Sequence, residues 1–227
     1  MKRSAINAIL KENAAFLRSR GFVLPPFSYW SPDEWKDKGH EYDEIRDNAL
    51  GWDITDFGSG DYEKTGLFLF TLRNGNRSMP DKYKKPYAEK IMVVGEGQVT
   101  PLHYHYYKME DIINRGGGTL VIKMYNADKT TDLPDEETPV TVHSDGMIYE
   151  IPAGGEVRLA PGQSVTLHPY QYHSFSAEGG KTMVTEVSMC NDDRTDNRFA
   201  DPVGRFPEIE EDEEPLYLLC SEYPPAK

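Results

Sequence analysis

Short strand-like segments separated by glycine and proline are the feature of this sequence that most restricts its fold. They begin after Gly51, and β-branched or aromatic residues in them alternate with polar ones, as in half-buried strands. The expected strands are residues 66–73, 88–94, 98–106, 119–126, 140–143, 155–159, 164–168, 174–177 and 182–189. Asn74-Gly75 is typical of a tight hairpin turn after the first of them. This pattern predicts an all-β protein, either a sandwich or a barrel.

The first 60 residues show helical periodicity instead. Ser4 is placed to cap a helix that runs to about Arg20, where Gly21 would end it. Residues 31–34 (Ser-Pro-Asp-Glu) form a capping box with proline at the first helical position, which predicts a second, short helix. Residues 44–50 are expected to add another turn. These patterns predict an N-terminal helical arm.

Three regions follow from these patterns: a helical arm (1–60), a barrel with the functional site (61–200) and an acidic tail (201–227). The arm is expected to pack on the barrel or on a partner subunit. Residues 208–214 of the tail are an acidic run, which we expect to be a solvated edge or a mobile segment. Residues 216–220 are apolar enough to dock on the body of the protein or on a second subunit.

The charge balance is acidic, with 25 Lys and Arg against 38 Asp and Glu and a formal net charge of −13. A chain of this charge is poorly suited to bind nucleic acid or an anionic membrane surface, because both repel it. No window approaches 18 consecutive apolar residues, and residues 1–20 do not have the pattern of a signal peptide. Cys190 and Cys220 are more typical of reduced thiols than of a disulfide framework. We expect a cytoplasmic protein.

Histidines at alternate positions mark the candidate functional site. His103 and His105 would point to the same face of an extended strand, and Glu110 follows closely enough to add a carboxylate oxygen. His173 is the preferred third histidine, and His168 is its alternative. Three neutral imidazoles and one carboxylate can hold a divalent first-row metal such as Mn, Fe, Co, Ni or Zn, with positions left for water or substrate. The pattern therefore predicts a catalytic metal centre.

Two motifs in the barrel region resemble those of the cupins. The motif residues are Gly97-x5-His103-x-His105-x4-Glu110-x5-Gly116 for the first motif, and Pro161-Gly162 followed by Pro169-x3-His173 for the second. The second motif lacks its usual glycine between proline and histidine. This resemblance implies a cupin double-stranded β-helix barrel, which is jelly-roll-like, with the N-terminal helical segment outside it.

A longer set of segments is similar to the D-lyxose isomerase family of aldose–ketose isomerases. These segments are residues 88–90, 96–105, 108–118, 172–175, 186–188 and 191–193. The resemblance implies that the three histidines and Glu110 bind Mn2+, with Co2+, Fe2+ and Zn2+ as other candidates. It implies conversion of the monosaccharide D-lyxose to D-xylulose, with D-mannose and D-fructose as a further pair. The cupin resemblance also suggests a homodimer, because cupins commonly pair through their sheet edges.

Aldose–ketose conversion moves a proton between C1 and C2 through a cis-enediol, so the site needs a base. Glu186 is our candidate for that base, because alternation places it on the more polar face of its strand, with Thr182 and Ser188. Glu110 is the alternative, since a carboxylate ligand can detach from a metal. Metal binding normally lowers its basicity.

Cationic and hydrogen-bonding groups are also needed near the substrate oxygens. Lys108 lies between His105 and Glu110 in the sequence, which makes it a candidate catalytic and substrate-binding group. Lys90 precedes an apolar run and is expected at the cavity wall. Asp192 and Asp193 follow the Glu186 strand and are expected at the cavity mouth, where carboxylates can bind sugar hydroxyls.

Three other functions use a similar fold or site. The same ligands support an iron or nickel dioxygenase in other cupins. A phosphosugar isomerase would need clustered Arg, Lys and hydroxyl donors shaped for phosphate, and the barrel segment has no such cluster. The third alternative is a cupin that binds sugar or metal without turnover. His40 and His143 stand alone in polar stretches, and we expect both to be structural or superficial.

Overall fold

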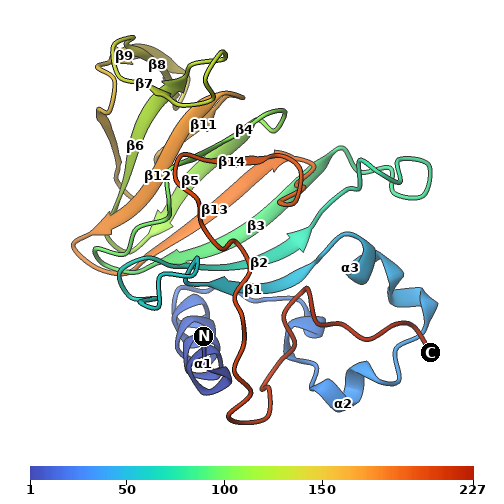
Figure 1. Cartoon of the computed structure of the whole chain (residues 1–227). Coiled ribbons are helices and arrows are strands. Elements are labelled where there is room, and N and C mark those ends of the chain that lie inside the picture. Colours follow the sequence, from blue (N-terminus) through green and yellow to red (C-terminus); the bar gives the residue numbers. More distant parts are fainter.

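The computed structural model describes residues 1–227 and shows two curled antiparallel sheets with the helices gathered at one end (Figure 1). The helices, two of them 3-10 turns (η1, η2), are α1 (Arg3–Ser19), η1 (Pro26–Tyr29), α2 (Pro32–Trp35), η2 (His40–Tyr42) and α3 (Asp43–Asp47). The strands are β1 (Gly51–Thr55), β2 (Leu67–Arg73), β3 (Tyr87–Val94), β4 (His103–His105), β5 (Glu110–Gly116), β6 (Thr119–Ala127), β7 (Pro134–Asp135), β8 (Val140–Ser144), β9 (Met147–Ile151), β10 (Glu156–Leu159), β11 (Ser164–Leu167), β12 (Gln171–Glu178), β13 (Thr182–Met189) and β14 (Asn197–Phe199). None of the helices is long and apolar enough to span a membrane.

The sheets are built from strands that are distant in the sequence. One sheet has the order β1-β2-β3-β13-β5-β11-β8-β9, and the other has the order β10-β6-β12-β4-β14, with β7 beside β6. β13 lies between β3 and β5, and β12 lies between β6 and β4, all antiparallel. This arrangement of crossing antiparallel strands is that of the cupin barrel predicted from the sequence.

The inner faces of the two sheets enclose a core that is apolar at one end of the barrel and polar at the other. β13 shows the change along a single strand: Val184 belongs to the apolar core, whereas Glu186 and Ser188 continue the same buried face as polar residues. Val187 and Met189, on the opposite face, are exposed. Polar groups inside a barrel need partners there, so this end of the barrel is where a functional site is expected.

Helix α1 packs on the outer face of the larger sheet. Ile6, Leu10 and Leu17 are fully buried in a second cluster of apolar residues, together with side chains of β1, β2 and β3. Burial of each such side chain contributes about 1.5–3 kcal/mol. The helix ends as expected at Gly21 (φ +77°), and the backbone N–H of Phe22 donates to the carbonyl of Leu17, as in a Schellman motif. The prediction of this helix and of its end is confirmed.

The acidic tail docks on the start of α1, which corrects the expectation for Ser4. Ser4 does not cap the helix, which begins at Arg3; instead the N–H and the hydroxyl of Ser4 both donate to the carboxylate of Asp212. Glu211 pairs with the buried guanidinium of Arg3. The tail carboxylates thus bind the positive end of a helix, because unpaired N–H groups there attract anions. Residues 210–214 stay exposed, as expected of a solvated edge.

The tail continues along the N-terminal elements (red in Figure 1). Leu219 is buried and forms a β-bridge with Trp52 of β1, as expected for the apolar residues 216–220. Further on, Arg46 of the short helix α3 donates to the carbonyl of Pro224. The two ends of the chain therefore close over the same side of the barrel.

Asn74 and Gly75 do not form the expected hairpin. β2 ends at Arg73 and β3 begins only at Tyr87, so a long loop connects the two strands. The side chain of Asn74 is buried, and its amide satisfies backbone groups of two other segments, at Asn48 and Asn191. A tight turn would expose that side chain to solvent, and the prediction was wrong because the tertiary contacts of Asn74 override its turn preference.

Candidate metal centre and active site

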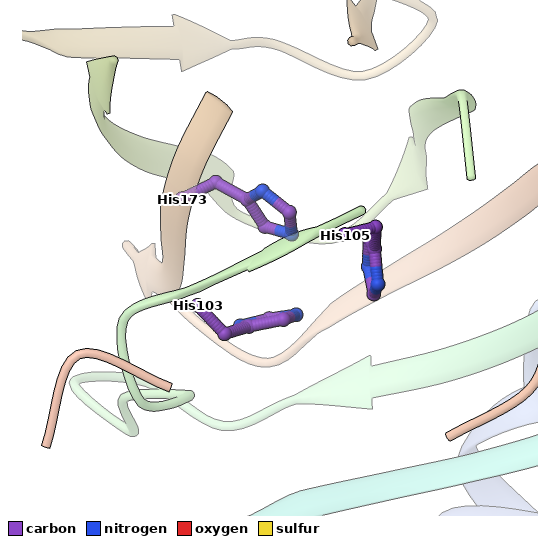
Figure 2. A group of neighbouring side chains, drawn as sticks. All are labelled: His103, His105 and His173. Carbon is purple, nitrogen blue, oxygen red and sulfur yellow. The ribbon is translucent and has the colours of Figure 1, made fainter. Parts of the chain in front are cut away.

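Three histidines come together on the inner face of the smaller sheet (Figure 2). His103 and His105 are the first and last residues of β4, so their side chains point to the same face, and His173 is paired with His103 across the two strands. All three are buried, and each offers one ring nitrogen within 4.8 Å of the others. Three buried histidines this close together form a group that could bind a metal ion.

Hydrogen bonds to backbone carbonyls orient two of these rings. Nδ1 of His103 lies 2.8 Å from the carbonyl of Pro101, and Nδ1 of His173 lies 3.0 Å from the carbonyl of Gln171. A carbonyl only accepts, so each Nδ1 carries the proton and each Nε2 presents a lone pair. Burial lowers the pKa of His103 well below 6.5 and also lowers that of His105, which keeps these rings neutral. Neutral imidazole is the metal-binding form.

Glu110, the first residue of β5, lies beside two of these histidines. Its Oε1 lies 3.2 Å from Nε2 of His173 and 3.4 Å from Nε2 of His105. For His173 this places a lone pair opposite an anionic oxygen, and Nε2 of His173 is buried without a hydrogen-bond partner. When two ligand atoms each lie about 2.1 Å from one cation and the angle between them at the cation is a right angle, they lie about 3 Å from each other. Oε1 of Glu110 is therefore close enough to His105 and His173 to share a metal ion with them, and the ion would separate groups that otherwise repel.

The other oxygen of Glu110 faces Lys108. Lys108 Nζ lies 2.7 Å from Oε2 of Glu110 and 3.0 Å from Oε1 of Glu186. Burial alone would raise the pKa of Glu110, but the nearby charge of Lys108 holds it well below its ordinary value. Burial likewise opposes the charge of Lys108, and the two carboxylates outweigh it, so the pKa of Lys108 is raised. Lys108 thus joins the ligand Glu110 to a second carboxylate.

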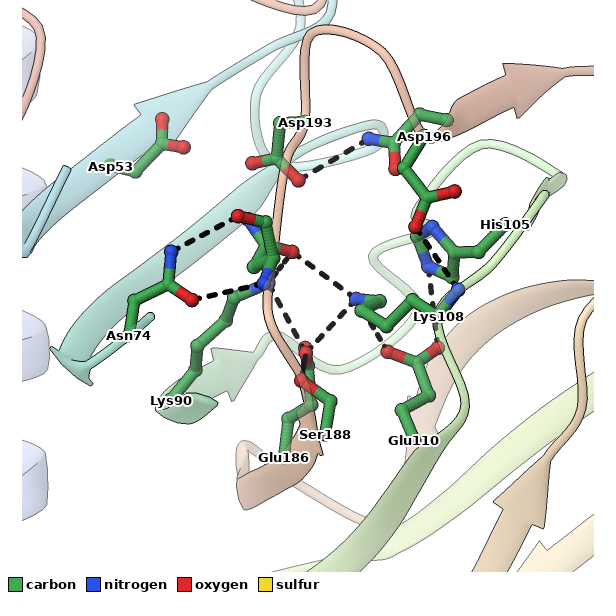
Figure 3. Close-up of polar contacts among 12 residues, drawn as sticks. Asp53, Asn74, Lys90, His105, Lys108, Glu110, Glu186, Ser188, Asp193 and Asp196 are labelled. Atoms are coloured by element: carbon green, nitrogen blue, oxygen red, sulfur yellow. Dashed lines mark hydrogen bonds and ion pairs between the residues drawn. The ribbon is translucent and has the colours of Figure 1, made fainter. Parts of the chain in front are cut away.

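That second carboxylate, Glu186, is surrounded by donors (Figure 3). Its Oε1 lies 3.2 Å from Nζ of Lys90, which is its cross-strand partner in β3, and accepts a hydrogen bond of 2.9 Å from Ser188. Together with Lys108, these groups make three contacts to one oxygen atom. No hydrogen bond in the structure uses Oε2. Glu186 therefore has one oxygen held in place and one that is free to react.

Three of the candidate ligands, His103, His105 and Glu110, line the same cavity as Glu186. Its polar walls are formed by charged, imidazole and amide groups, namely Lys90, His103, His105, Lys108, Glu110, Glu186, Asp193, Asn197 and Arg205, with the hydroxyl of Thr100. Its apolar walls are Phe57, Leu67, Leu69, Met92, Phe175 and Phe199. A mixed lining with convergent polar groups is typical of a site for a small polar ligand.

The structure separates His173 from its alternative, His168. His173 lies in the histidine group, whereas the ring of His168 packs against His143, 4.7 Å between ring centres, outside it. It also separates the two aspartates: Asp193 lines the cavity beside the lysines, whereas the carboxylate of Asp192 accepts hydrogen bonds from Arg194 and Thr195 of its own loop. Among the candidates named from sequence, His173 belongs to the histidine group without lining the cavity, and Asp192 lies outside both.

Arg205 is a cavity residue that the sequence did not indicate. It lies in the tail and donates to Asp53 of β1 and to Asp193, at 2.6 Å in each case. The guanidinium of Arg205, with Lys90 and Lys108, overcomes the effect of burial and lowers the pKa of Asp193 below its ordinary value. No motif marks Arg205, because its partners are distant in the chain and meet only in the fold.

Solved structures with the same fold are sugar isomerases. An L-ribose isomerase from Acinetobacter sp. DL28 in complex with L-ribose superposes with a TM-score of 0.60 at 16% identity, over 92% of this chain and 98% of that chain. An L-ribose isomerase from Cellulomonas parahominis with L-ribose gives a TM-score of 0.57 at 18% identity, with the same coverage. At this identity the likeness establishes the fold, and the cupin-type barrel predicted from the sequence is confirmed.

Sequence relatives identify the family. A D-lyxose/D-mannose isomerase from Serratia proteamaculans is 49% identical over 226 residues, and one from Escherichia coli O157:H7 is 47% identical over 227 residues; each alignment covers 98% of both chains. Barrel, cavity and relatives together define an aldose–ketose isomerase of the cupin type. The sequence model of the D-lyxose isomerase family matches residues 1–223, and the chain belongs to that family.

Proposed function

We propose that this enzyme is a metal-dependent isomerase that interconverts D-lyxose and D-xylulose through a cis-enediol, with D-mannose and D-fructose as a second pair. The observation that carries the proposal is the shared cavity, in which a metal-ligand group and a carboxylate flanked by two lysines face the same space. The relatives at 47% and 49% identity are named D-lyxose/D-mannose isomerases, which supports the choice of sugars.

His103, His105, His173 and Glu110 are the residues that would hold the metal. We propose Mn2+, with Co2+, Fe2+ or Zn2+ as substitutes, because imidazole nitrogen and carboxylate oxygen suit all of these ions. The ion supplies Lewis-acid stabilisation of negative charge on the substrate oxygens. Lys108 keeps Glu110 ionised and fixes its Oε2, so that Oε1 stays directed at the histidines.

Glu186 is the proposed base, through its Oε2. It would remove the proton from C2 of the aldose and return it to C1 on the same face of the enediol. The three donors on Oε1 prevent the carboxylate from rotating away during the transfer. Glu110 is less suited to this role, because one of its oxygens faces the histidines and the other is bound by Lys108.

The two lysines have different numbers of free donors. An ammonium group has three N–H donors. Lys108 uses its three on Glu110, Glu186 and Asn191, whereas Lys90 contacts only Glu186 and Asn191. We therefore assign the donation to a substrate oxygen first to Lys90, while Lys108 must exchange a partner to reach the substrate. Asp193, on the cavity wall, is the proposed acceptor for sugar hydroxyls.

The phosphosugar alternative fits the cavity less well. Its cations are already matched by carboxylates: Lys90 and Lys108 by Glu186 and Glu110, and Arg205 by Asp53 and Asp193. A phosphate dianion would have to displace one of these partners. No observation favours the dioxygenase or the cupin without turnover. The homodimer and the cytoplasmic location stay predictions.

The test is reconstitution of metal-free protein. Chelation should abolish the conversion of D-lyxose to D-xylulose, and Mn2+ should restore it. In D2O, deuterium should appear at C1 of the xylulose, because the base exchanges its proton with solvent during some turnovers. Oxygen consumption, measured in parallel, should be absent. If the reconstituted protein forms no xylulose, the assignment of this substrate fails.

A further inference from the structure

Asn191 occupies a central place beside the two lysines. It follows β13 closely, and its Oδ1 accepts hydrogen bonds from Lys90 Nζ at 2.6 Å and from Lys108 Nζ at 3.3 Å. The same two ammonium groups lie 3.2 Å and 3.0 Å from Oε1 of Glu186. Two cations therefore share two acceptors, one a carboxylate oxygen and the other a neutral amide oxygen.

The position of Asn191 is set by Asn74. The side-chain amide of Asn74 donates to the carbonyl of Asn191 at 3.0 Å and accepts from the N–H of Asn191 at 2.9 Å. Asn74 is held in turn by Asn48, through a reciprocal pair of amide-to-carbonyl hydrogen bonds of 3.2 Å and 3.0 Å. Asn48 and Asn74 are both buried. The chain of three asparagines links the N-terminal arm, the loop after β2 and the loop after β13.

This arrangement resolves a physical conflict in the cavity. Two ammonium groups that converge on one carboxylate repel each other, and each would tend to move toward solvent or toward the metal ligands. A neutral acceptor on the far side holds both without adding a charge that would compete with Glu186. It leaves one N–H of Lys90 without a partner, in a cavity where a substrate oxygen can accept it.

We propose that Asn191, held by Asn74, is a positioning residue for the isomerase reaction: it fixes Lys90 and Lys108 against Glu186 in the geometry required for turnover. The proposal rests on the proposed function for its kinetic consequence. The position of the ammonium groups can be tested without turnover. Displacement of a reacting group by about 1 Å can cost about 100-fold in rate.

The experiment compares Asn191→Leu, Asn191→Asp and Asn74→Ala in the full-length, Mn2+-loaded protein. Leu has nearly the same shape as Asn but accepts no hydrogen bond, so we expect kcat to fall about 10- to 100-fold, with KM and the bound Mn2+ changed less than about threefold. Asn191→Asp keeps an acceptor oxygen and should retain more of kcat than Asn191→Leu. Asn74→Ala frees the Asn191 backbone and should lower kcat in the same direction by a smaller factor.

The matched control is Asn76→Ala. Asn76 holds the same loop, through hydrogen bonds to Asp47 and Asn48, but forms no hydrogen bond with Asn191 or with a lysine. It should leave kcat within about threefold of the parent protein. Equal losses of kcat in Asn76→Ala and Asn191→Leu would show that any loosening of the loop reduces turnover, and would overturn the proposal. Equal losses of kcat in Asn191→Leu and Asn191→Asp would also overturn the proposal.

A second readout does not depend on activity. Ammonium groups held in fixed hydrogen bonds exchange their protons slowly, so 15N-lysine spectra of the parent protein should show protected signals for Lys90 and Lys108. Asn191→Leu should lose them, and Asn76→Ala should keep them. Retention of both signals in Asn191→Leu would disprove the positioning role. If the parent protein shows the protected signals but does not isomerise lyxose, the proposed function fails and the structural part of the inference stands.

Discussion

The two halves of the cavity are built on different principles. The metal-ligand half is local: β4 alone supplies two histidines on one face, and pairing with β12 adds the third. Burial favours the neutral form of His103 and His105, and backbone carbonyls within two residues in the chain orient the rings of His103 and His173. The second half, around Glu186, is where we propose proton transfer; it is charged, and it is held by loops and by the tail.

This difference determines how strongly burial of each half destabilises the folded protein. Neutral histidines with a backbone hydrogen-bond partner are inexpensive to bury, and a bound metal ion would satisfy the ring nitrogens that lack one. In the other half, Lys90, Lys108 and Glu186 are all nearly inaccessible to solvent. Buried charges destabilise the fold unless each one is paired. Changes in the first half should therefore act on metal binding, and changes in the second on turnover and stability.

The largest expected effect is loss of the third histidine. His173→Gln should abolish stable Mn2+ binding and reduce activity by about 10⁴-fold, because Lewis-acid stabilisation contributes several kcal/mol. His168→Gln is the matched control, since His168 lies outside the histidine group, and should keep both. Bound Mn2+, measured by elemental analysis, and initial rates are the checks. A His168→Gln protein without metal would contradict this assignment of the third histidine.

The next effect separates metal binding from proton transfer. Glu186→Gln should lower kcat by about 10³-fold, because the amide cannot act as a base, while Mn2+ content stays the same. Glu89→Gln changes a carboxylate on the same sheet that pairs with Arg73, and it should have little effect on rate. If Glu186→Gln retains near-normal kcat, the base is another group, with Glu110 as the first candidate.

Arg205 tests the cost of the charged half to stability. Arg205→Met leaves Asp53 and Asp193 without their cation, which should lower the free energy of unfolding by about 3–5 kcal/mol at pH 7. Arg158→Met removes an exposed arginine paired with Glu156 and Glu178, and should cost less than about 1 kcal/mol. Urea unfolding at a series of pH values measures both.

The pH dependence of that effect has a definite sign. In the parent protein the pKa of Asp193 lies below its ordinary value of 3.8, so the unfolded chain takes up the proton first as pH falls. The contribution of Asp193 to stability is therefore present at neutral pH and is lost from about pH 5 downward. The stability difference between Arg205→Met and the parent protein should shrink as pH falls below about 5. A difference that stays constant with pH would show that Arg205 acts by packing alone.

The smallest effect distinguishes two neighbouring aspartates. Asp193→Asn should reduce kcat/KM by about tenfold, as expected for loss of a charged hydrogen-bond acceptor at the cavity wall. Asp192→Asn should stay within about threefold, because its carboxylate serves only its own loop. Steady-state kinetics with D-lyxose measures both. Equal losses in the two variants would place Asp192 in contact with substrate after all.

Sequence reasoning succeeded where short-range geometry determines position. Alternation along a strand placed His103 and His105 on one face, and helix-terminal residues predicted the end of α1 at Gly21. It failed where a side chain finds its partners far away. Asn74 resembles a turn residue, but its side chain forms hydrogen bonds with the backbone of Asn191. At the start of α1, the carboxylate of Asp212 in the tail replaces the expected capping by Ser4.

From the order of its residues alone, this chain predicts a cupin barrel with His103, His105 and Glu110 close together, because strand periodicity and motif spacing are local properties. The third histidine, preferred at His173, had His168 as its alternative. The fold adds the rest: the tail residue Arg205 beside Asp193, and Asn191 between the two lysines. These contacts join segments that are distant in the chain. No local pattern encodes these contacts, since the partners of buried polar and charged groups are brought together only by the tertiary structure.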